Sequence, residues 1–454
     1  MKYTLFSLVN CAFVFRAPFR IFFKMKDKTE KRMGNQLEPW RRNLYTIWIA
    51  QFLAMMGMNL VVPFLPFYIR ELGVTQADEV ANWSGLVYAG PFFLSFFFTP
   101  LWSILGDKYG RKAMTVRAIF GLAISQALIG LSPNVEMLLI FRMLQGVLSG
   151  FIAAALALVS ATTPREKSGY AIGLLQSASS SGTVIGPLVG GSLADLVGYR
   201  PLFFIVAAIC SIAGFVILQF TIESEDQRNA TISFKNILDN YHYALRFKAI
   251  RAALGIILLT QVAMIMIQPI FSLYVDSLES NKDYLATIAG SIYSTAGLAM
   301  VISSAWWGKR NDTKSYKKNL SIAIFGASIA FAAQGLVTQA YQLIFLRTLQ
   351  GLCMGGILPT LYSYISKNSN ADRRGGTIGI AASFNILASM IGPPLGGVIA
   401  ANFGLRENFF VTGGLLFSAI IFVQIFFVDM RGTDELPATA NESFHKAEVI
   451  EEVS

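Results

Sequence analysis

The sequence predicts an all-α polytopic membrane protein, with twelve transmembrane helices in two six-helix halves that repeat one another. Three observations support this prediction. The 454 residues are 54% hydrophobic and only 14% charged, whereas soluble domains carry about 25% charged residues. Apolar runs long enough to cross about 30 Å of hydrocarbon recur along the chain. The polar residues among these runs repeat at a fixed offset.

The repeat is visible in residues that are not apolar. Asp107 recurs 205 positions later (312 − 107) as Asp312, and the second half also repeats a second and a third group of polar and small residues. At offset 205, Arg142, Gln145 and Gly146 become Arg347, Gln350 and Gly351; at offset 206 (392 − 186), Gly186, Pro187, Gly190 and Gly191 become Gly392, Pro393, Gly396 and Gly397. Two halves in register are typical of transporters built from parallel repeats, whose site lies between the halves.

The apolar runs define the expected spans. Backbone groups in lipid must be hydrogen-bonded within their own segment, so each span is expected to be a helix. The spans are predicted at residues 44–69, 82–105, 114–132, 136–160, 169–194, 199–220, 252–275, 285–307, 319–338, 341–365, 376–401 and 406–428.

The spans divide the chain into two membrane halves and three polar segments. The first forty residues are compatible with a signal peptide, an amphipathic surface helix, or a start assigned too early, with Met25 or Met33 as the initiator. We place no function there. The linker between the halves is expected to end in a short surface helix over 241–248. The predicted segments are a basic cytoplasmic extension 1–43, the N-terminal half 44–220, a cytoplasmic linker 221–250, the C-terminal half 251–429, and a disordered cytoplasmic tail 430–454.

The formal net charge of +10 is distributed unevenly. Basic residues collect in alternate loops, and the other loops carry single ones. This is the positive-inside bias of membrane proteins, so it indicates topology rather than a nucleic-acid surface. It places both termini and the linker on the cytoplasmic side. The basic loops contain Lys108, Arg111, Lys112 and Arg117; Arg165 and Lys167; Lys309, Arg310, Lys314, Lys317 and Lys318; Lys367, Arg373 and Arg374.

The composition argues against an enzyme. Cys11, Cys210 and Cys353 have no metal-site spacing, and the only histidines, His242 and His445, lie in polar segments. A lipid-modifying enzyme would need His, Asp or Glu at membrane depth, and none is visible. There is no phosphate-binding Gly-x4-Gly-Lys-Ser/Thr loop. We therefore expect no metal, no cofactor and no use of ATP. A nutrient-sensing, non-transporting protein would carry a large cytosolic domain, for which the tails are too short.

The loop at 106–112 is the strongest local signal. Two glycines permit a tight turn between antiparallel helices. An acid at this turn can meet the partially positive N-terminus of a helix in the opposite half. The loop is therefore expected to act as a latch that closes one conformation; the alternative is a basic turn that only fixes topology. Its residues are Gly106, Asp107, Gly110, Arg111 and Lys112, and a degraded copy surrounds Asp312.

Arg142 lies inside the fourth predicted span. A charge at this depth costs about 3 kcal/mol on the insertion scale, so it is expected to face a partner or a wet cavity. Gln145 and Gly146 continue the same stretch and leave a slim face for helix packing. The alternative is an arginine that extends outward to the membrane surface.

The fifth predicted span carries Gly182-x3-Gly186-Pro187-x2-Gly190-Gly191. Small residues four apart let helices touch backbone to backbone, and the proline loosens one helical turn. The motif is expected to form a pivot or a seal between helices; the alternative is structural packing alone.

Together these residues resemble the major facilitator superfamily. The loop at 106–112 resembles its cytoplasmic loop motif, the stretch 139–150 its arginine-containing fourth helix, and the motif at 182–191 the antiporter motif of its drug:proton exporters. Gly57-x5-Pro63-x2-Pro66 is similar to the first-helix motif of the twelve-helix branch. The stretches around Trp83, Pro164 and Tyr199 look like the MdtG-type multidrug exporters. The resemblance covers roughly 40–430 and implies a two-half transporter fold and efflux.

One position departs from this family pattern. Many relatives carry an acid in the first helix as proton acceptor, and here that position is Asn59. The resemblance therefore leaves the proton carrier open. We predict that Arg142, with Gln145 and Gly146, belongs to the coupling site and that an acid near a helix end carries the proton. The candidate acids are Asp276, Glu71 and Asp195.

Polar and aromatic residues at mid-depth are the candidates for a substrate cavity. Gln261 and Gln268 are seven residues apart and so are expected on one helix face. Flexible Met and Phe side chains would give an adaptable wall for varied guests, although such residues also commonly face lipid. The candidates are Gln51, Met55, Asn59, Tyr88, Gln261, Gln268, Tyr293, Tyr362 and Asn385, with Met264, Met266 and Phe271 in the wall.

The sequence thus predicts a monomeric, multi-pass transporter of the inner membrane. It is expected to export amphiphilic drugs or metabolites by alternating access in exchange for protons, with lipid as its surroundings. The alternative is a carrier of one metabolite, or a uniporter, that is not coupled to protons.

Overall fold

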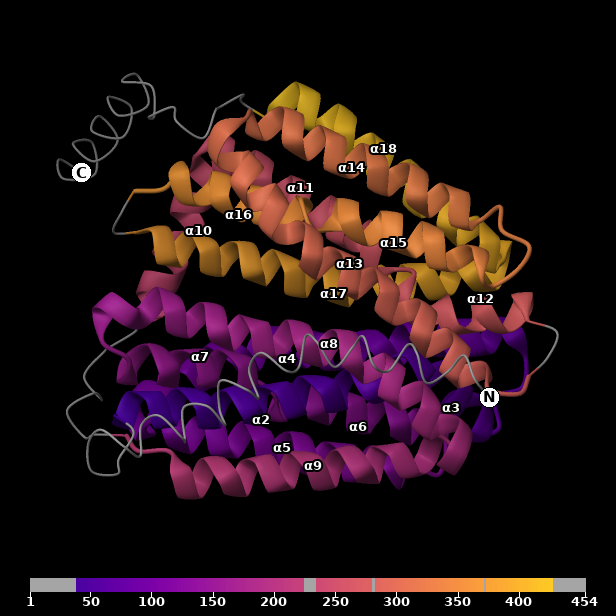
Figure 1. Ribbon diagram of the computed structural model, residues 1–454, viewed down its shortest axis with the longest axis horizontal. Helices are drawn as coiled ribbons and strands as arrows, with labels where there is room; N and C mark the ends of the chain where they lie inside the picture. The colour runs from indigo at the N-terminus through magenta and orange to yellow at the C-terminus, as the bar shows by residue number, and fades with distance from the viewer. Residues whose placement is uncertain (1–37, 224–233, 280–281, 371–372, 428–454) are drawn as a thin grey trace, which may run out of the picture.

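The computed structural model describes residues 38–223, 234–279, 282–370 and 373–427, and within them it is helical with no strand. The chain forms two stacked helical layers, one from each half (Figure 1). The N-terminal half comprises α2 (Pro39–Val61), η1 (Val62–Phe64), α3 (Leu65–Glu71), α4 (Ala77–Tyr109), α5 (Arg111–Gly130), α6 (Val135–Leu148), α7 (Phe151–Thr162), α8 (Ser168–Val197) and α9 (Tyr199–Phe220). The C-terminal half comprises α11 (Lys248–Ile265), η4 (Gln268–Ile270), α12 (Phe271–Leu278), α13 (Leu285–Thr313), α14 (Tyr316–Gln334), α15 (Gln342–Met354), α16 (Ile357–Lys367), α17 (Arg374–Phe403) and α18 (Leu405–Phe426).

Within these ranges, ten helical runs are long and apolar enough to cross a membrane. α8 and α14 occupy the two remaining predicted spans. α8 is rich in Ser and Gly, and α14 begins with Lys317 and Lys318, so neither contains an apolar stretch that meets the same requirement. The predicted all-α membrane fold with two helical halves is confirmed.

Four predicted spans are interrupted rather than continuous. The first breaks at Pro63 and the seventh at Pro269, where a short 3₁₀ turn replaces the α-helical hydrogen bonds that a proline cannot donate. The fourth breaks at Gly150, whose φ of 104° only glycine adopts readily. The tenth breaks at Gly355, between α15 and α16. The breaks are paired by the repeat: Pro269 lies 206 residues after Pro63, and Gly355 lies 205 residues after Gly150.

The repeat extends to single hydrogen bonds. The indole of Trp102 donates to the Val147 carbonyl at 2.7 Å, and that of Trp307 donates to the Leu352 carbonyl at 2.8 Å. Each residue of the second pair lies 205 positions after its counterpart in the first (307 − 102 and 352 − 147). The two halves therefore share packing contacts as well as helix order, as expected for repeats related by an axis along the membrane normal.

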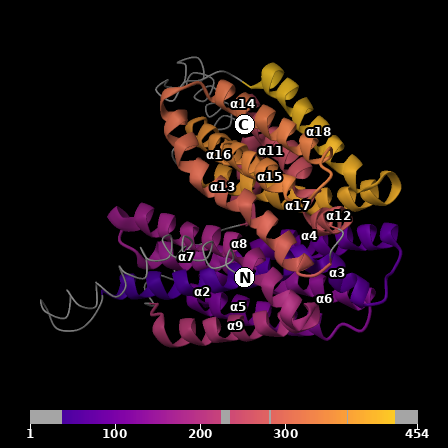
Figure 2. The same ribbon diagram turned by 45° about the vertical axis from the view of Figure 1, so that its right-hand side comes forward.

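The halves meet along two seams, α4 against α17 and α8 against α13. Both seams are lined by glycines, because a Cβ at these positions would collide with the backbone of the facing helix. The contacts pair Gly85 with Pro393, Gly397 with Ala81, Gly191 with Ala286, and Gly290 with Pro187. All lie toward the end of the molecule that holds α3 and α12, and the ribbons of the halves diverge toward the other end (Figure 1, Figure 2).

The linker helix and the ends of the chain complete the comparison with the predicted segments. The helix expected over 241–248 is present as α10 (Phe234–Arg246), but it begins earlier and ends two residues sooner. Its Tyr243 hydroxyl accepts from the Asn370 backbone at 3.2 Å, which ties the linker to the C-terminal half. The predicted extension 1–43 and tail 430–454 lie largely or wholly outside the described residues.

Candidate functional site

The contact between the halves joins two of the predicted cavity residues. The Tyr88 hydroxyl on α4 donates to the Gln268 side-chain carbonyl on η4. Tyr88 also packs with Ile265 and Ala388 of the C-terminal half. One residue from each half therefore meets between the repeats, where this architecture leads one to expect the transport site; we call this contact the inter-half centre.

Arg142 lies on α6 beside this centre and is 3% exposed. Its Nε donates to the Val87 carbonyl at 3.2 Å, and its Nη1 donates to Gln145 Oε1 at 2.8 Å. Gly146 lets α6 approach α4 so closely that a Cβ would strike the Pro91 carbonyl. The arginine therefore faces the protein interior, and the alternative of an outward-directed side chain does not describe this structure. None of the candidate acids Asp276, Glu71 and Asp195 bonds to it here.

Arg347 is the repeat counterpart of Arg142 and is 5% exposed on α15. Its guanidinium carbon lies 3.6 Å from the centre of the Phe271 ring and 5.6 Å from that of Tyr293. Its Nε and Nη2 are buried without a hydrogen-bond partner in the described structure. Tyr88 and Tyr293 are themselves repeat counterparts (293 − 88 = 205).

Some of the other cavity candidates bind within their own half, and others have buried polar atoms without a hydrogen-bond partner. Gln51 donates to Ser179 at 2.6 Å, and Asn59 donates to the Met55 carbonyl at 2.8 Å, so both bind within their own half. Buried polar atoms without a partner among the described residues are found at Gln261 Nε2 and Asn385 Oδ1. Tyr362 is half-buried.

The prediction that Gln261 and Gln268 share one helix face assumed an unbroken α-helix, which the structure does not have here. α11 ends at Ile265, before the 3₁₀ turn at Pro269, so no continuous helix connects the two glutamines. The proline interrupts the hydrogen-bond ladder that the seven-residue spacing assumed. Gln268 is directed to Tyr88 instead.

The motif in α8 lies at helix contacts on two sides. A Cβ at Gly182, Gly186 or Gly190 would collide with α2, near Met56, Asn59 and Leu60. Gly191 faces the other way, against the Ala286 carbonyl of α13. Gly290 of α13 packs against the Pro187 carbonyl, with which a Cβ would collide. The helix continues unbroken through Pro187. The motif therefore packs α8 within its own half and against the opposite half.

Polar contacts close one end of this interface, opposite the basic loops, which is the end that the basic-loop prediction assigns to the outside. Arg70 Nη1 donates to Asp276 Oδ2 at 2.7 Å, and Lys282 Nζ lies 2.7 Å from Oδ1 of the same carboxylate. Arg70 and Asp276 are repeat counterparts (276 − 70 = 206). Asp195 of α8 accepts from the backbone of Ala286 and Thr287 at 3.1 and 2.8 Å, so it caps the N-terminus of α13 across the halves. We call these contacts the outer closure.

The 106–112 loop differs from its prediction in one respect. Gly106 lies inside α4, so the turn depends on Gly110 alone, with φ of 100°. Glu223, at the start of the predicted linker, accepts from the backbone of Arg111 and Lys112 at 2.8 and 3.0 Å and so caps α5. The Asp107 side chain is outside the described structure. Its copy, Asp312, is exposed near the end of α13.

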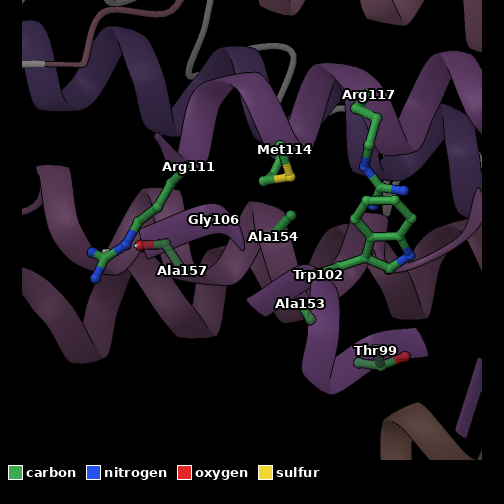
Figure 3. A pocket seen from close by; sticks show the side chains of 10 residues that line it. Thr99, Trp102, Gly106, Arg111, Met114, Arg117, Ala153, Ala154 and Ala157 are labelled. Carbon is green, nitrogen blue, oxygen red and sulfur yellow. Dashed lines mark hydrogen bonds between the residues drawn. The ribbon is translucent and has the colours of Figure 1, made fainter. Parts of the chain in front are cut away.

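A cavity of about 140 Å³ lies beside this loop, between α4, α5 and α7. Arg117 stacks on Trp102, with the guanidinium carbon 3.6 Å from the ring centre, and Arg111 reaches toward the Ala157 carbonyl (Figure 3). Thr99, Met114, Ala153 and Ala154 complete a mainly apolar wall. This cavity belongs to one half and lies away from the inter-half centre.

One residue and one ion pair near these contacts were not predicted from the sequence. Arg347 was recognised as the copy of Arg142 but was not assigned to the site. Arg70 was not paired with Asp276, although the offset of 206 relates them. In both cases the repeat offset was the available signal.

Comparison with known proteins agrees with this architecture. The family model for the Major Facilitator Superfamily matches residues 47–337 and again 253–452. Multidrug resistance protein MdtG of Salmonella arizonae is 37% identical over 385 residues, which is 84% of this chain and 94% of that protein; MdtG of Salmonella paratyphi B has the same identity and coverage.

Solved structures show the same fold. A bacterial homologue of the human lysosomal transporter Spinster, in an inward-facing and occupied conformation, superposes with a TM-score of 0.73 at 15% identity, covering 86% of this chain and 97% of that one. A D-xylose–proton symporter superposes with a TM-score of 0.68 at 13% identity, covering 87% of this chain and 99% of that one. The repeat, the helix arrangement and these matches together show that the chain is a multi-pass membrane transporter that belongs to the major facilitator superfamily.

Proposed function

We propose that the protein exports amphiphilic small molecules across the inner membrane by alternating access, in exchange for protons. The observation that carries the proposal is the asymmetry of the inter-half contact. Among the described residues, every hydrogen bond between the halves lies at the centre or at the outer closure. A molecule entering from the cytoplasmic side would meet Tyr88 and the two buried arginines before a closed outer end.

Export also agrees with the similarity to proteins named multidrug resistance proteins. The outer closure consists of a few polar contacts, and the two glycine seams beside it bring helix backbones together without a large interlocked core. Such a contact can open as a unit if the halves rock about their interface, which is how repeat transporters alternate. Opening it and closing the basic-loop end would release the cargo outside. We expect Asp107 to contribute to that second closure.

Proton exchange is proposed through Arg142. A guanidinium stays charged, so it favours the ionised form of a carboxylate that approaches it and can release a proton in one conformation only. In the present conformation Asp276 and Asp195 bind other groups in the outer closure. Opening the closure would free both to take up a proton from outside, and the return to the closed conformation, where cationic groups and backbone amides favour the ionised form, would release it on the cytoplasmic side; these are the acids we propose as proton carriers.

The test uses inverted membrane vesicles that contain the full-length protein and a lumenal pH dye. Respiration acidifies the lumen, and addition of an exported compound should release protons from it. We expect release with wild type from a panel of lipophilic cations, anions and neutral compounds, and none with Arg142→Ala, whose substrate binding stays measurable. An unchanged response of Arg142→Ala would make the arginine structural.

A second candidate is a uniporter. The observation that favours it is Asn59, which stands where relatives carry an acid and which donates to the Met55 carbonyl like a packing residue. Substrate movement that ignores the pH gradient in wild-type vesicles would establish this alternative.

A further inference from the structure

The two buried arginines at the centre occupy equivalent positions but have different surroundings. Arg142 has two protein acceptors, the Val87 carbonyl and Gln145 Oε1. At the repeat offset of 205, these correspond to the Ile292 carbonyl and Gln350 Oε1 in the C-terminal half. If the halves were equivalent, Arg347 would donate to both.

Both of these acceptors are taken by other donors. The Thr295 hydroxyl donates to the Ile292 carbonyl at 2.7 Å. Gln334 Nε2 donates to Gln350 Oε1 at 3.0 Å, and Gln350 in turn points its own amide at Met354. In the N-terminal half, Gly90 stands at the position of Thr295, and so it has no hydroxyl to compete for the carbonyl.

As a result, Arg347 Nε and Nη2 have no partner among the described residues. These two nitrogens form one edge of the guanidinium, and their hydrogens point in the same direction. That edge matches the two oxygens of a carboxylate, sulfonate or phosphate. Leaving two donors of a charged group unpaired inside the protein is costly, so an acceptor from outside would be strongly favoured.

Aromatic rings flank this edge. Phe271 covers one face of the guanidinium, and Phe271 and Tyr293 meet edge to face with ring centres 5.8 Å apart. The N-terminal half has Leu65 at the position of Phe271. No described Asp or Glu bonds to either arginine. The surroundings are therefore cationic and aromatic, and they suit a ligand with a negative head and an apolar body.

We propose that the Nε/Nη2 edge of Arg347 binds the negatively charged head group of an amphiphilic substrate, and that Arg142 is held by the protein for another purpose. This inference rests on the proposed function, since it names the substrate class of the same site. The specificity would come from the loss of both internal acceptors in one repeat only.

The test measures binding without transport. Full-length protein is placed in phosphatidylcholine nanodiscs at pH 7.5, and the fluorescence of dansyl-undecanoic acid is titrated beside that of its uncharged primary amide. We expect wild type to bind the acid at least about tenfold more tightly than the amide, because a paired guanidinium–carboxylate contact is charge-assisted. Equal affinities for acid and amide in wild type would overturn the proposal without any variant.

Three variants refine the result. Arg347→Gln should remove the preference for the acid and leave amide binding unchanged, whereas Arg251→Gln, at an exposed position on α11, should change neither. Thr295→Ala should weaken binding of the acid severalfold, because it returns the Ile292 carbonyl to Arg347. If Arg347→Gln retains the preference, or loses both ligands equally while folded, the edge is not the binding site. If that variant does not fold, the wild-type comparison and Thr295→Ala decide.

Repeating the titration in phosphatidylglycerol nanodiscs separates two sources of the anion. A lipid head group in the site would weaken binding of the acid to wild type, whereas a site reserved for soluble anions would give the same affinity in both discs. Either result supports the anion site. If wild type binds the acid selectively but releases no protons in vesicles, the proposed export is contradicted and this inference stands. If protons are released without selective binding of the acid, this inference is contradicted and the proposed export stands.

Discussion

Breaking the Arg70–Asp276 pair should shift the protein toward an outward-open state. The pair joins equivalent positions of the two repeats at 2.7 Å, with side chains 40% and 15% exposed. Exposed ion pairs contribute about 0.2–1 kcal/mol, and the shielding of Asp276 favours the upper part of that range. A loss of about 0.5–1 kcal/mol from the closed state alone corresponds to a two- to fivefold change in population, roughly exp(ΔG/RT).

Distances between spin labels can measure this change. Leu131 and Leu336 are repeat counterparts in different halves, at the outer ends of α5 and α14, and both side chains are exposed. Labels at these positions, in a variant with Cys11, Cys210 and Cys353 replaced, should give a short distance in wild type. Arg70→Gln should add a longer-distance population.

A double-mutant cycle isolates the pair from its neighbours. Asp276→Asn also loses the contact with Lys282, but that contact lies within the C-terminal half, so the shift in population should match that of Arg70→Gln. The double variant should match Asp276→Asn alone, because the shared contact can be lost only once. Additive effects, or a distance distribution that does not respond to Arg70→Gln, would refute the assignment of this pair to the outer closure.

Further predictions follow from the seams, the loop motif and the topology. Gly397→Ala should slow transport and open the outer end, because its Cβ would lie 2.7 Å from the Ala81 carbonyl, an overpacking cost of about 1–3 kcal/mol; Gly379→Ala on the same helix, with open space around it, is the matched control. Asp107→Asn should reduce turnover more than thermal stability, and equal turnover and crosslinking in mutant and wild type would exclude a latch. Reporter fusions after Lys248 and after Asn281 should lie on opposite sides of the membrane; the same side for both would contradict the basic-loop topology.

Much of the fold could be predicted from the sequence because lipid imposes simple rules. Apolar runs of sufficient length must be helices, and a fixed offset between polar residues reveals the two halves. The interruptions at Pro63, Gly150 and Pro269 were not predicted, since spacing alone does not show whether a proline bends a helix or ends it. The expected shared face of Gln261 and Gln268 assumed an unbroken helix, so it stays a prediction.

The site was predicted less completely, because its chemistry depends on competition between donors. Arg142 and Arg347 look alike in the sequence. Their difference arises from Thr295, which replaces Gly90 of the other repeat and takes a carbonyl, and from Gln334, which takes the glutamine. A comparison of the halves position by position would have found the first change, but only the structure reveals which acceptor each donor uses.

Concentrative transport by the purified full-length protein in liposomes tests proton-coupled export most directly. The lumen is made acidic relative to the outside, and uptake of a lipophilic cation, an anion and a neutral compound is followed at equal starting concentrations on both sides. We predict that at least one compound accumulates in the lumen above its external concentration. Collapse of the pH gradient should then make the two concentrations equal again. Concentrations that stay equal on both sides, with or without the gradient, would contradict proton-coupled export.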